Sequence, residues 1–116
     1  MSELKSSTAV LGPGVGSFLK WEATPLTRVA VPAASGTKAG EFVVFPLRGD
    51  KYIALTDEEN GKVIIQPHNC VIDLSLISAA AINDAYDGTE ESPVSAGDLS
   101  TRMDVYGIVF IGSPTV

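Results

Sequence analysis

Residues 51–66 read KYIALT-DEENG-KVIIQ, which is two short apolar runs joined by an acidic turn. Both runs are rich in β-branched and aromatic residues, and the turn ends in Asn60-Gly61, a dipeptide typical of tight hairpin turns. The stretch therefore predicts a β-strand at 51–56 and a returning strand at 62–66. Short strands separated by such turns are the pattern of a small β domain.

Further short apolar runs lie on both sides of this stretch. They predict four more strands, at 27–32, 41–45, 70–77 and 103–111. The strand at 41–45 is expected to form a hairpin with 51–56 through the turn Arg48-Gly49-Asp50. In the segment 70–77, alternation places on one face the side chains of Cys70, Ile72, Leu74 and Leu76.

The segments between these strands contain little regular structure on this interpretation. The alanine-rich residues 78–83 can form a single helical turn, because alanine favours helix. The acidic segment 84–97 is expected to be a loop. The predicted fold class is therefore all-β, a small sandwich or barrel-like domain with room for one short helical turn.

Length and composition are those of one folded domain. The chain has 116 residues, of which 45% are hydrophobic and 19% charged, as in a globular rather than a disordered protein. It has 8 basic and 14 acidic residues, a formal net charge of -6, and no basic patch is visible. Because binding to nucleic acid needs basic groups against the phosphates, no nucleic-acid partner is expected.

The sequence shows no sign of a disulfide scaffold or of a membrane protein. Cys70 is the single cysteine, so an internal disulfide is excluded. No apolar stretch approaches the roughly 20 residues that span a bilayer. Residues 1–5 lack the basic and apolar regions of a signal peptide. We therefore expect a protein made in a reducing cytoplasm, with no membrane partner.

Reactive side chains meet at one place, Pro67-His68-Asn69-Cys70. In an extended strand His68 and Cys70 would point to the same face and could supply two ligands to a zinc ion. Two more ligands would be needed, and the chain has no other His or Cys. We expect a histidine in a turn and a buried structural cysteine. No catalytic, cofactor-binding or metal-binding residues are predicted, and the chain is not expected to be an enzyme.

The first 20 residues differ from the rest, and we divide the chain into a flexible apolar arm at 1–20 and a single β domain at 21–116. The arm has the Gly, Pro and Ser content of a flexible segment, yet it is too apolar for a solvated tail. It could order on a partner or a neighbouring subunit, or pack on its own domain as a terminal strand. The candidate docking residues are Val10, Leu11, Val15, Phe18, Leu19 and Trp21.

Several apolar segments carry a resemblance to a known family. They are AGEFVVF at 39–45, KYIALTD at 51–57, GKVIIQ at 61–66 and CVIDL at 70–74, followed by INDAYD at 82–87 and YGIVF at 106–110. Their succession resembles the small head decoration, or capsid cement, proteins of tailed bacteriophages. The resemblance covers residues 39–112.

The resemblance implies a non-enzymatic β domain that binds the outer surface of an expanded capsid, commonly as a trimer at local three-fold positions. Its partner would be the major capsid protein and its location the virion, where it would reinforce the shell against the pressure of packaged DNA. The N-terminal segment would order on the capsid. The alternatives are another virion component, such as a tail, fibre or neck protein, and a small-ligand-binding β-barrel.

Overall fold

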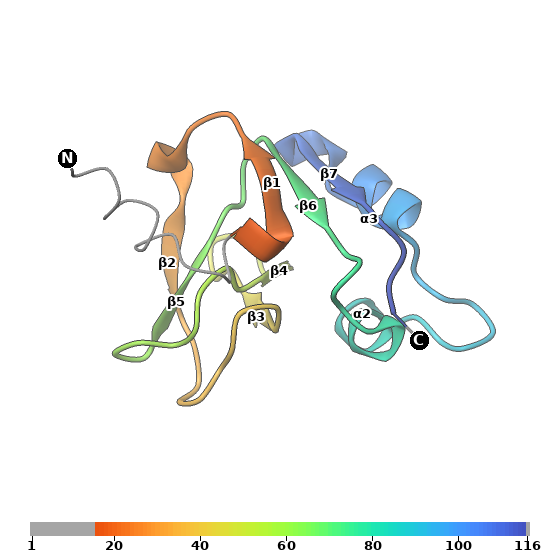
Figure 1. Cartoon of the computed structure of the whole chain (residues 1–116), viewed down its shortest axis with the longest axis horizontal. Helices are drawn as coiled ribbons and strands as arrows, with labels where there is room; N and C mark the ends of the chain where they lie inside the picture. Colours follow the sequence, from red (N-terminus) through yellow and green to blue (C-terminus); the bar gives the residue numbers. More distant parts are fainter. Residues whose placement is uncertain (1–15, 116) are drawn as a thin grey trace.

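The largest sheet joins strands from the two ends of the chain. In the computed structural model, which describes residues 16–115, β1 (Leu19–Glu22) pairs antiparallel with β6 (Cys70–Asp73), and β6 pairs parallel with β7 (Ile108–Ile111). Figure 1 shows β6 as the central strand, between β1 and β7. Parallel neighbours need a long crossover connection, which residues 74–107 provide.

Two antiparallel ribbons complete the β structure: β2 (Val29–Pro32) pairs with β5 (Lys62–Ile65), and β3 (Phe42–Val44) pairs with β4 (Lys51–Ile53). The strands predicted around the acidic turn are confirmed in position, and so is the hairpin between 41–45 and 51–56. The partner of β5 is β2 rather than β4. The chain crosses between the ribbons at residues 54–55, where Ala54 still donates its N–H to Glu41 while Leu55 donates to Ile64 O at 2.8 Å.

The crossover contains more helix than the sequence predicted. α2 (Ala79–Tyr86) begins after Ser78, whose hydroxyl accepts the N–H of Ala81, and it extends the expected single turn to eight residues. The helix continues because Ile82 and Tyr86, four residues apart, both lie in the core. It ends at Asp87, which has a left-handed backbone with φ of 62°.

A second helix, α3 (Ala96–Arg102), begins at the end of the segment 84–97, which was expected to be a loop, and continues through residues 98–102, for which no element was predicted. It begins with a capping box, in which Ser95 Oγ accepts the N–H of Asp98 and the Asp98 carboxylate accepts the N–H of Ser95. A 3-10 turn, η2 (Asp104–Tyr106), follows, so the closing strand begins at Ile108 rather than at 103. The all-β prediction was therefore too narrow: the protein is sheet-rich with short helices.

The predicted strand 70–77 also ends early. Asp73 Oδ1 accepts the N–H of Ser75 at 2.9 Å, and this local bond turns the chain away from the extended conformation. The two faces beyond Leu74 are consequently exchanged, with Leu76 exposed and Ile77 buried. The prediction that Leu76 shares the face of Cys70 and Ile72 is wrong for this reason.

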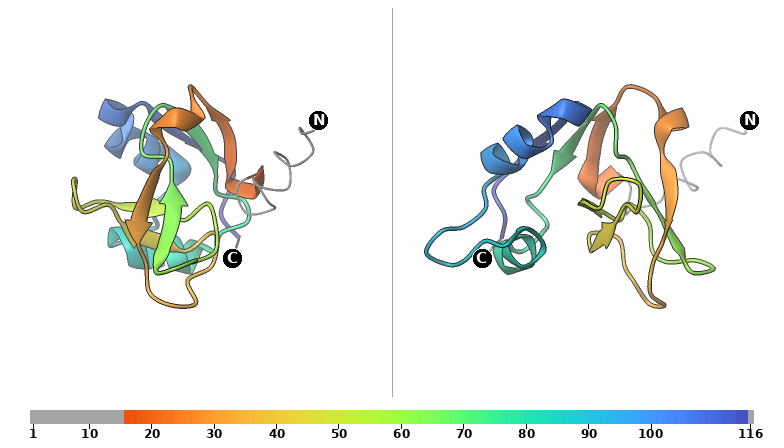
Figure 2. Two further views of the ribbon diagram at one scale, coloured as in Figure 1. Left: turned by 90° about the vertical axis from the view of Figure 1, so that its left-hand side faces the viewer. Right: turned by 180° about the vertical axis from the view of Figure 1, so that it is seen from behind.

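A single core connects the three sheets and the two helices. The ring of Tyr86 in α2 meets Phe42 of β3 edge-on at 5.4 Å, and its hydroxyl donates to Lys51 O of β4 at 2.5 Å. Figure 2 shows the helices at one end of the molecule and the β2–β5 ribbon at the other. The fully buried side chains of the core include Val31, Leu55, Val63, Ile65, Leu74, Ile82, Leu99, Met103 and Ile108.

Helix α3 packs along the outer edge of β7. The Ser100 hydroxyl accepts the N–H of Phe110 at 2.8 Å and donates to the carbonyl of the same residue at 3.3 Å. The backbone groups that β7 turns away from β6 are thereby satisfied at Phe110. Over residues 16–115, no helix is long and apolar enough to cross a bilayer.

Candidate functional site

The sheet formed by β1, β6 and β7 carries apolar side chains on both faces, with Asp73 beside Ile111 on the outward face. One row of residues in register across the three strands points into the core and is buried; this inner row is Leu19, Ile72 and Phe110. The next row points outward; this outer row is Trp21, Val71 and Val109. Trp21 is 57% exposed and Val109 47%.

Ile111 extends the outward surface along β7 and is 43% exposed. We call Trp21, Val71, Val109 and Ile111 the Trp21 face. A solvent-facing sheet surface normally carries polar side chains, since only one face has to pack on a core. Exposed contiguous apolar surface of this kind is typical of a docking site.

A β-bulge turns Trp21 outward. Leu19 and Trp21 are two residues apart and would share one face in a regular strand. Leu19 pairs with Ile72, however, while Trp21 pairs with the adjacent Val71, so that β1 carries Lys20 as an extra residue against β6. The extra residue shifts the alternation by one position, which leaves Leu19 in the core and Trp21 in solvent.

The structure separates the docking residues that the sequence grouped together. Phe18 and Leu19 are buried, so they belong to the domain core and not to a free arm surface. Phe18 packs on Gly40, whose position would bring an added Cβ to 2.7 Å from Phe18 Cζ. Val10, Leu11 and Val15 lie outside the described residues. Trp21 is the one candidate seen at the surface of the described chain.

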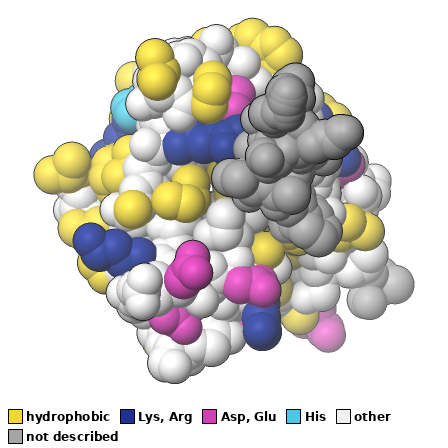
Figure 3. All heavy atoms as spheres, turned by 60° about the vertical axis from the view of Figure 1, so that its left-hand side comes forward, with side chains coloured by type: hydrophobic (Ala, Val, Ile, Leu, Met, Phe, Trp, Pro, Cys, Tyr) yellow, Lys and Arg dark blue, Asp and Glu magenta, His cyan; other side chains and the backbone are white. Residues whose placement is uncertain are grey.

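The acidic turns hold loops together. Glu58 accepts the N–H groups of Gly36 and Gly61, and these hydrogen bonds hold the pKa of its carboxyl below the ordinary value. Asp57 accepts the N–H of Ala39 at 3.0 Å. In Figure 3, most of the acidic side chains of the face shown lie in its lower part, whereas most of the apolar side chains lie above and to the left.

The histidine and the cysteine do not form a reactive pair. Cys70 is buried, its thiol donates to Gln66 O at 3.5 Å, and burial raises the pKa of the thiol to about 12. Such a thiol is protonated at neutral pH and is neither a nucleophile nor a ready metal ligand. His68 lies in the turn before β6, half-buried against Arg48. Among residues 16–115, no group of three or more His, Cys, Asp or Glu side chains is placed to hold a metal ion.

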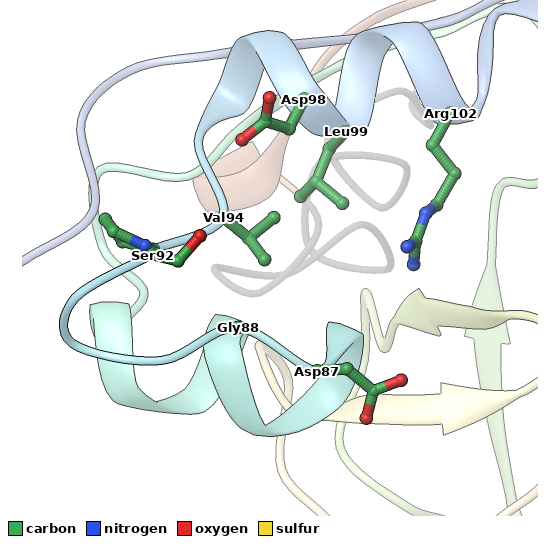
Figure 4. Close-up of a pocket in the computed structure, with 8 residues that line it drawn as sticks. Asp87, Gly88, Ser92, Val94, Asp98, Leu99 and Arg102 are labelled. Atoms are coloured by element: carbon green, nitrogen blue, oxygen red, sulfur yellow. The ribbon is translucent and has the colours of Figure 1, made fainter.

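A shallow pocket of about 240 Å³ lies between the end of α2 and α3. Figure 4 shows Asp98 and Arg102 on opposite sides of Leu99 along α3, with Asp87 below them. Both α3 side chains have structural roles, since Asp98 completes the capping box and Arg102 lies over the Tyr86 ring at 5.3 Å. The pocket therefore presents no set of polar groups arranged for catalysis.

The Trp21 face is the candidate functional site that these observations leave. The other exposed large apolar side chains come from separate segments of the chain; they are Leu26, Val44, Leu47, Leu76 and Val105. Comparison of the chain with family models, curated proteins and solved structures finds no match in any of the three.

Proposed function

We propose that the protein is a non-enzymatic capsid decoration protein, which binds the outer surface of an assembled phage head and stabilises it. The observation that carries the proposal is the Trp21 face, an apolar surface that crosses the three strands of a sheet and is open to solvent. Trp is enriched among the residues that dominate binding at interfaces. The choice of a capsid as the partner is supported by the resemblance of residues 39–112 to capsid cement proteins.

The proposed mode of binding has two parts. The Trp21 face lies against the major capsid protein, and the apolar residues Val10, Leu11 and Val15 add contacts from the N-terminal segment. Three copies acting together as a trimer bind more tightly than one, because each bound copy raises the effective concentration of the others. In this proposal the domain is a small barrel-like β domain made in the host cytoplasm and located in the virion.

Co-sedimentation with expanded capsids of the cognate phage tests this proposal. We expect saturable binding, with a number of copies per shell that matches the three-fold positions. Trp21→Ala is expected to weaken binding by roughly 30-fold or more, the size of an interface hot spot. The matched control is Leu26→Ala, because Leu26 is 90% exposed and lies in η1 (Pro25–Thr27), outside the sheet.

The outcomes separate the alternatives. Failure of the folded wild-type protein to bind capsids would contradict the decoration role and would favour another virion component, a tail, fibre or neck protein. Binding that Trp21→Ala leaves intact would retain the capsid but move the docking surface away from the Trp21 face. Light scattering of the free protein checks the trimer separately.

A further inference from the structure

Arg48 joins two turns that are far apart in sequence. Its Nη1 donates to the hydroxyl of Tyr52 at 2.8 Å and to the carbonyl of Pro67 at 2.7 Å. Its guanidinium lies 3.6 Å from the centroid of the Tyr106 ring, which is a close cation–π contact. Arg48 thereby ties the turn at 45–50 to the turn at 66–69 and to η2.

The fourth contact of Arg48 depends on protonation. Its Nη2 lies 3.1 Å from Nδ1 of His68. Arginine has no hydrogen-bond acceptor and stays charged, so it must donate, and His68 Nδ1 must accept through its lone pair. The neutral imidazole therefore carries its proton on Nε2. A second proton can enter only at Nδ1, where it removes the acceptor and places two positive charges about 3 Å apart.

The groups packed around this contact come from β4, from η2 and from the residues that precede β6. Tyr52 and Tyr106 lie against Arg48 from β4 and η2, and burial raises the pKa of Tyr52. Asp50 lies near Tyr52 on the same hairpin. On the other side, Gln66 accepts the N–H of His68 and donates to Glu22.

Glu22 is ion-paired with Arg28, and its pKa lies below the ordinary carboxyl value because Arg28 and Gln66 stabilise the charged form against the cost of burial. Cys70 is buried behind the turn with its thiol protonated. The pKa shifts of Glu22, Tyr52 and Cys70 move the titration of each group away from the range in which an imidazole titrates.

We propose that His68 is an acid-sensitive switch: its protonation breaks the bond to Arg48 and loosens the link between the turn at 45–50 and the turn at 66–69, which then depends on the hydrogen bond from Arg48 to the Pro67 carbonyl. The loosened turn carries Leu47, an apolar side chain that is 86% exposed. The proposal does not depend on capsid binding, since it rests only on contacts within the chain.

The direction of the effect on stability follows from the same contact. Partial burial and the Arg48 charge favour the neutral imidazole and lower the pKa of His68 from its ordinary 6.5. The stabilisation is therefore complete above the unfolded-state pKa and is lost as the pH falls through the lower pKa of the folded state. Each pKa unit by which the folded state lies below the unfolded state multiplies the unfolding equilibrium constant at low pH about tenfold.

NMR of the full-length protein tests the switch without any substitution. Long-range correlations between the imidazole nitrogens and carbons should show the proton on Nε2 near neutral pH. The amide signals of 47–50 and the Arg48 side-chain signals should then shift together with the titration of His68. A proton on Nδ1, a pKa of His68 at or above 6.5, or hairpin signals that do not follow His68 would each overturn the proposal.

A matched pair of variants gives a second readout. His68→Asn places an amide oxygen near the position of Nδ1, so it keeps an acceptor that does not titrate. Unfolding constants are compared at about pH 7.5 and about pH 5, on either side of the usual range of histidine. The wild-type constant should rise more than that of His68→Asn, and the excess should shrink when Arg48→Gln is added to both. An equal rise in wild type and His68→Asn would contradict the switch.

Discussion

The two faces of the sheet formed by β1, β6 and β7 use the same three strands for different purposes. The inner row is buried and packs in the single core, while the outer row leaves Trp21 and Val109 about half in water. The apolar character of the inner row is explained by stability, because burial of such side chains drives folding. Stability explains little of the apolar character of the outer row, and this is the observation behind our proposal that the row binds a partner.

The strongest test of this contrast uses neighbouring residues of β7. Phe110→Ala removes a buried ring and should lower the free energy of unfolding by about 3–5 kcal/mol. Val109→Ala, one position away on the other face, should lower it by about 1 kcal/mol or less. Urea unfolding of both variants measures the difference. A similar loss in the two would mean that the outer row is part of the stabilising structure after all.

A second test asks whether the inner face extends beyond the sheet to Phe18. Gly40 has φ of 96°, and an added Cβ would meet the Phe18 ring. Gly40→Ala should therefore combine the cost of a left-handed alanine with that of overpacking, about 2–4 kcal/mol together. Gly36, with φ of 86° and no atom within 4 Å of its added Cβ, is the control. Gly36→Ala should show only the backbone part, about 1–2 kcal/mol.

Urea unfolding measures both variants. An equal loss of unfolding free energy in the two would mean that the Phe18 ring does not pack tightly on Gly40, so that the packed inner face would not extend beyond Leu19.

The third test is the smallest and uses Cys70, which pairs with Ile108 further along the inner face. Its pKa is about 12 in the folded protein against an ordinary 9.0, so the folded state keeps its proton where the unfolded chain loses it. The stabilisation that comes from this thiol is therefore fully present when the pH is below the ordinary pKa. As the pH rises above that pKa, the free energy of unfolding falls by up to about 1.4 kcal/mol per pH unit.

Cys70→Ala should remove this part of the alkaline slope in denaturation curves measured between about pH 9 and pH 11. Any slope from the tyrosines is common to both proteins. Equal slopes would place the Cys70 thiol in a more polar environment than the inner face provides.

The strands could be predicted from the sequence because each is a local pattern. Runs such as Lys62–Ile65 are bounded by turn residues, and the strands form where those boundaries lie. The helix α3 was not predicted because the preceding acidic segment was interpreted as a loop. Leu99 is the one buried residue of the helix, and a single apolar position does not make a recognisable amphipathic pattern. The Ser95-x-x-Asp98 capping box is a sequence signal that predicts this helix start.

The candidate site depended on information that is not local. Trp21 was identified as a docking residue, but its direction is set by the bulge at Lys20, which exists only through the register of β1 against β6. The parallel pairing of β6 with β7 likewise joins segments nearly forty residues apart. A signal for the outer row was nevertheless present: β7 reads IVFI, apolar at every position, which indicates apolar side chains on both faces of its sheet.

The two hydrogen bonds of Ser100 have a consequence for self-assembly. A sheet edge with unpaired backbone groups can recruit strands from other molecules and seed fibrils, and apolar strands such as β7 are the most prone to do so. Because Ser100 occupies the outward N–H and C=O of Phe110, an incoming strand would have to displace α3 before it could extend the sheet at β7. This short helix therefore protects β7 against aggregation, although Val109 and Ile111 of that strand are exposed.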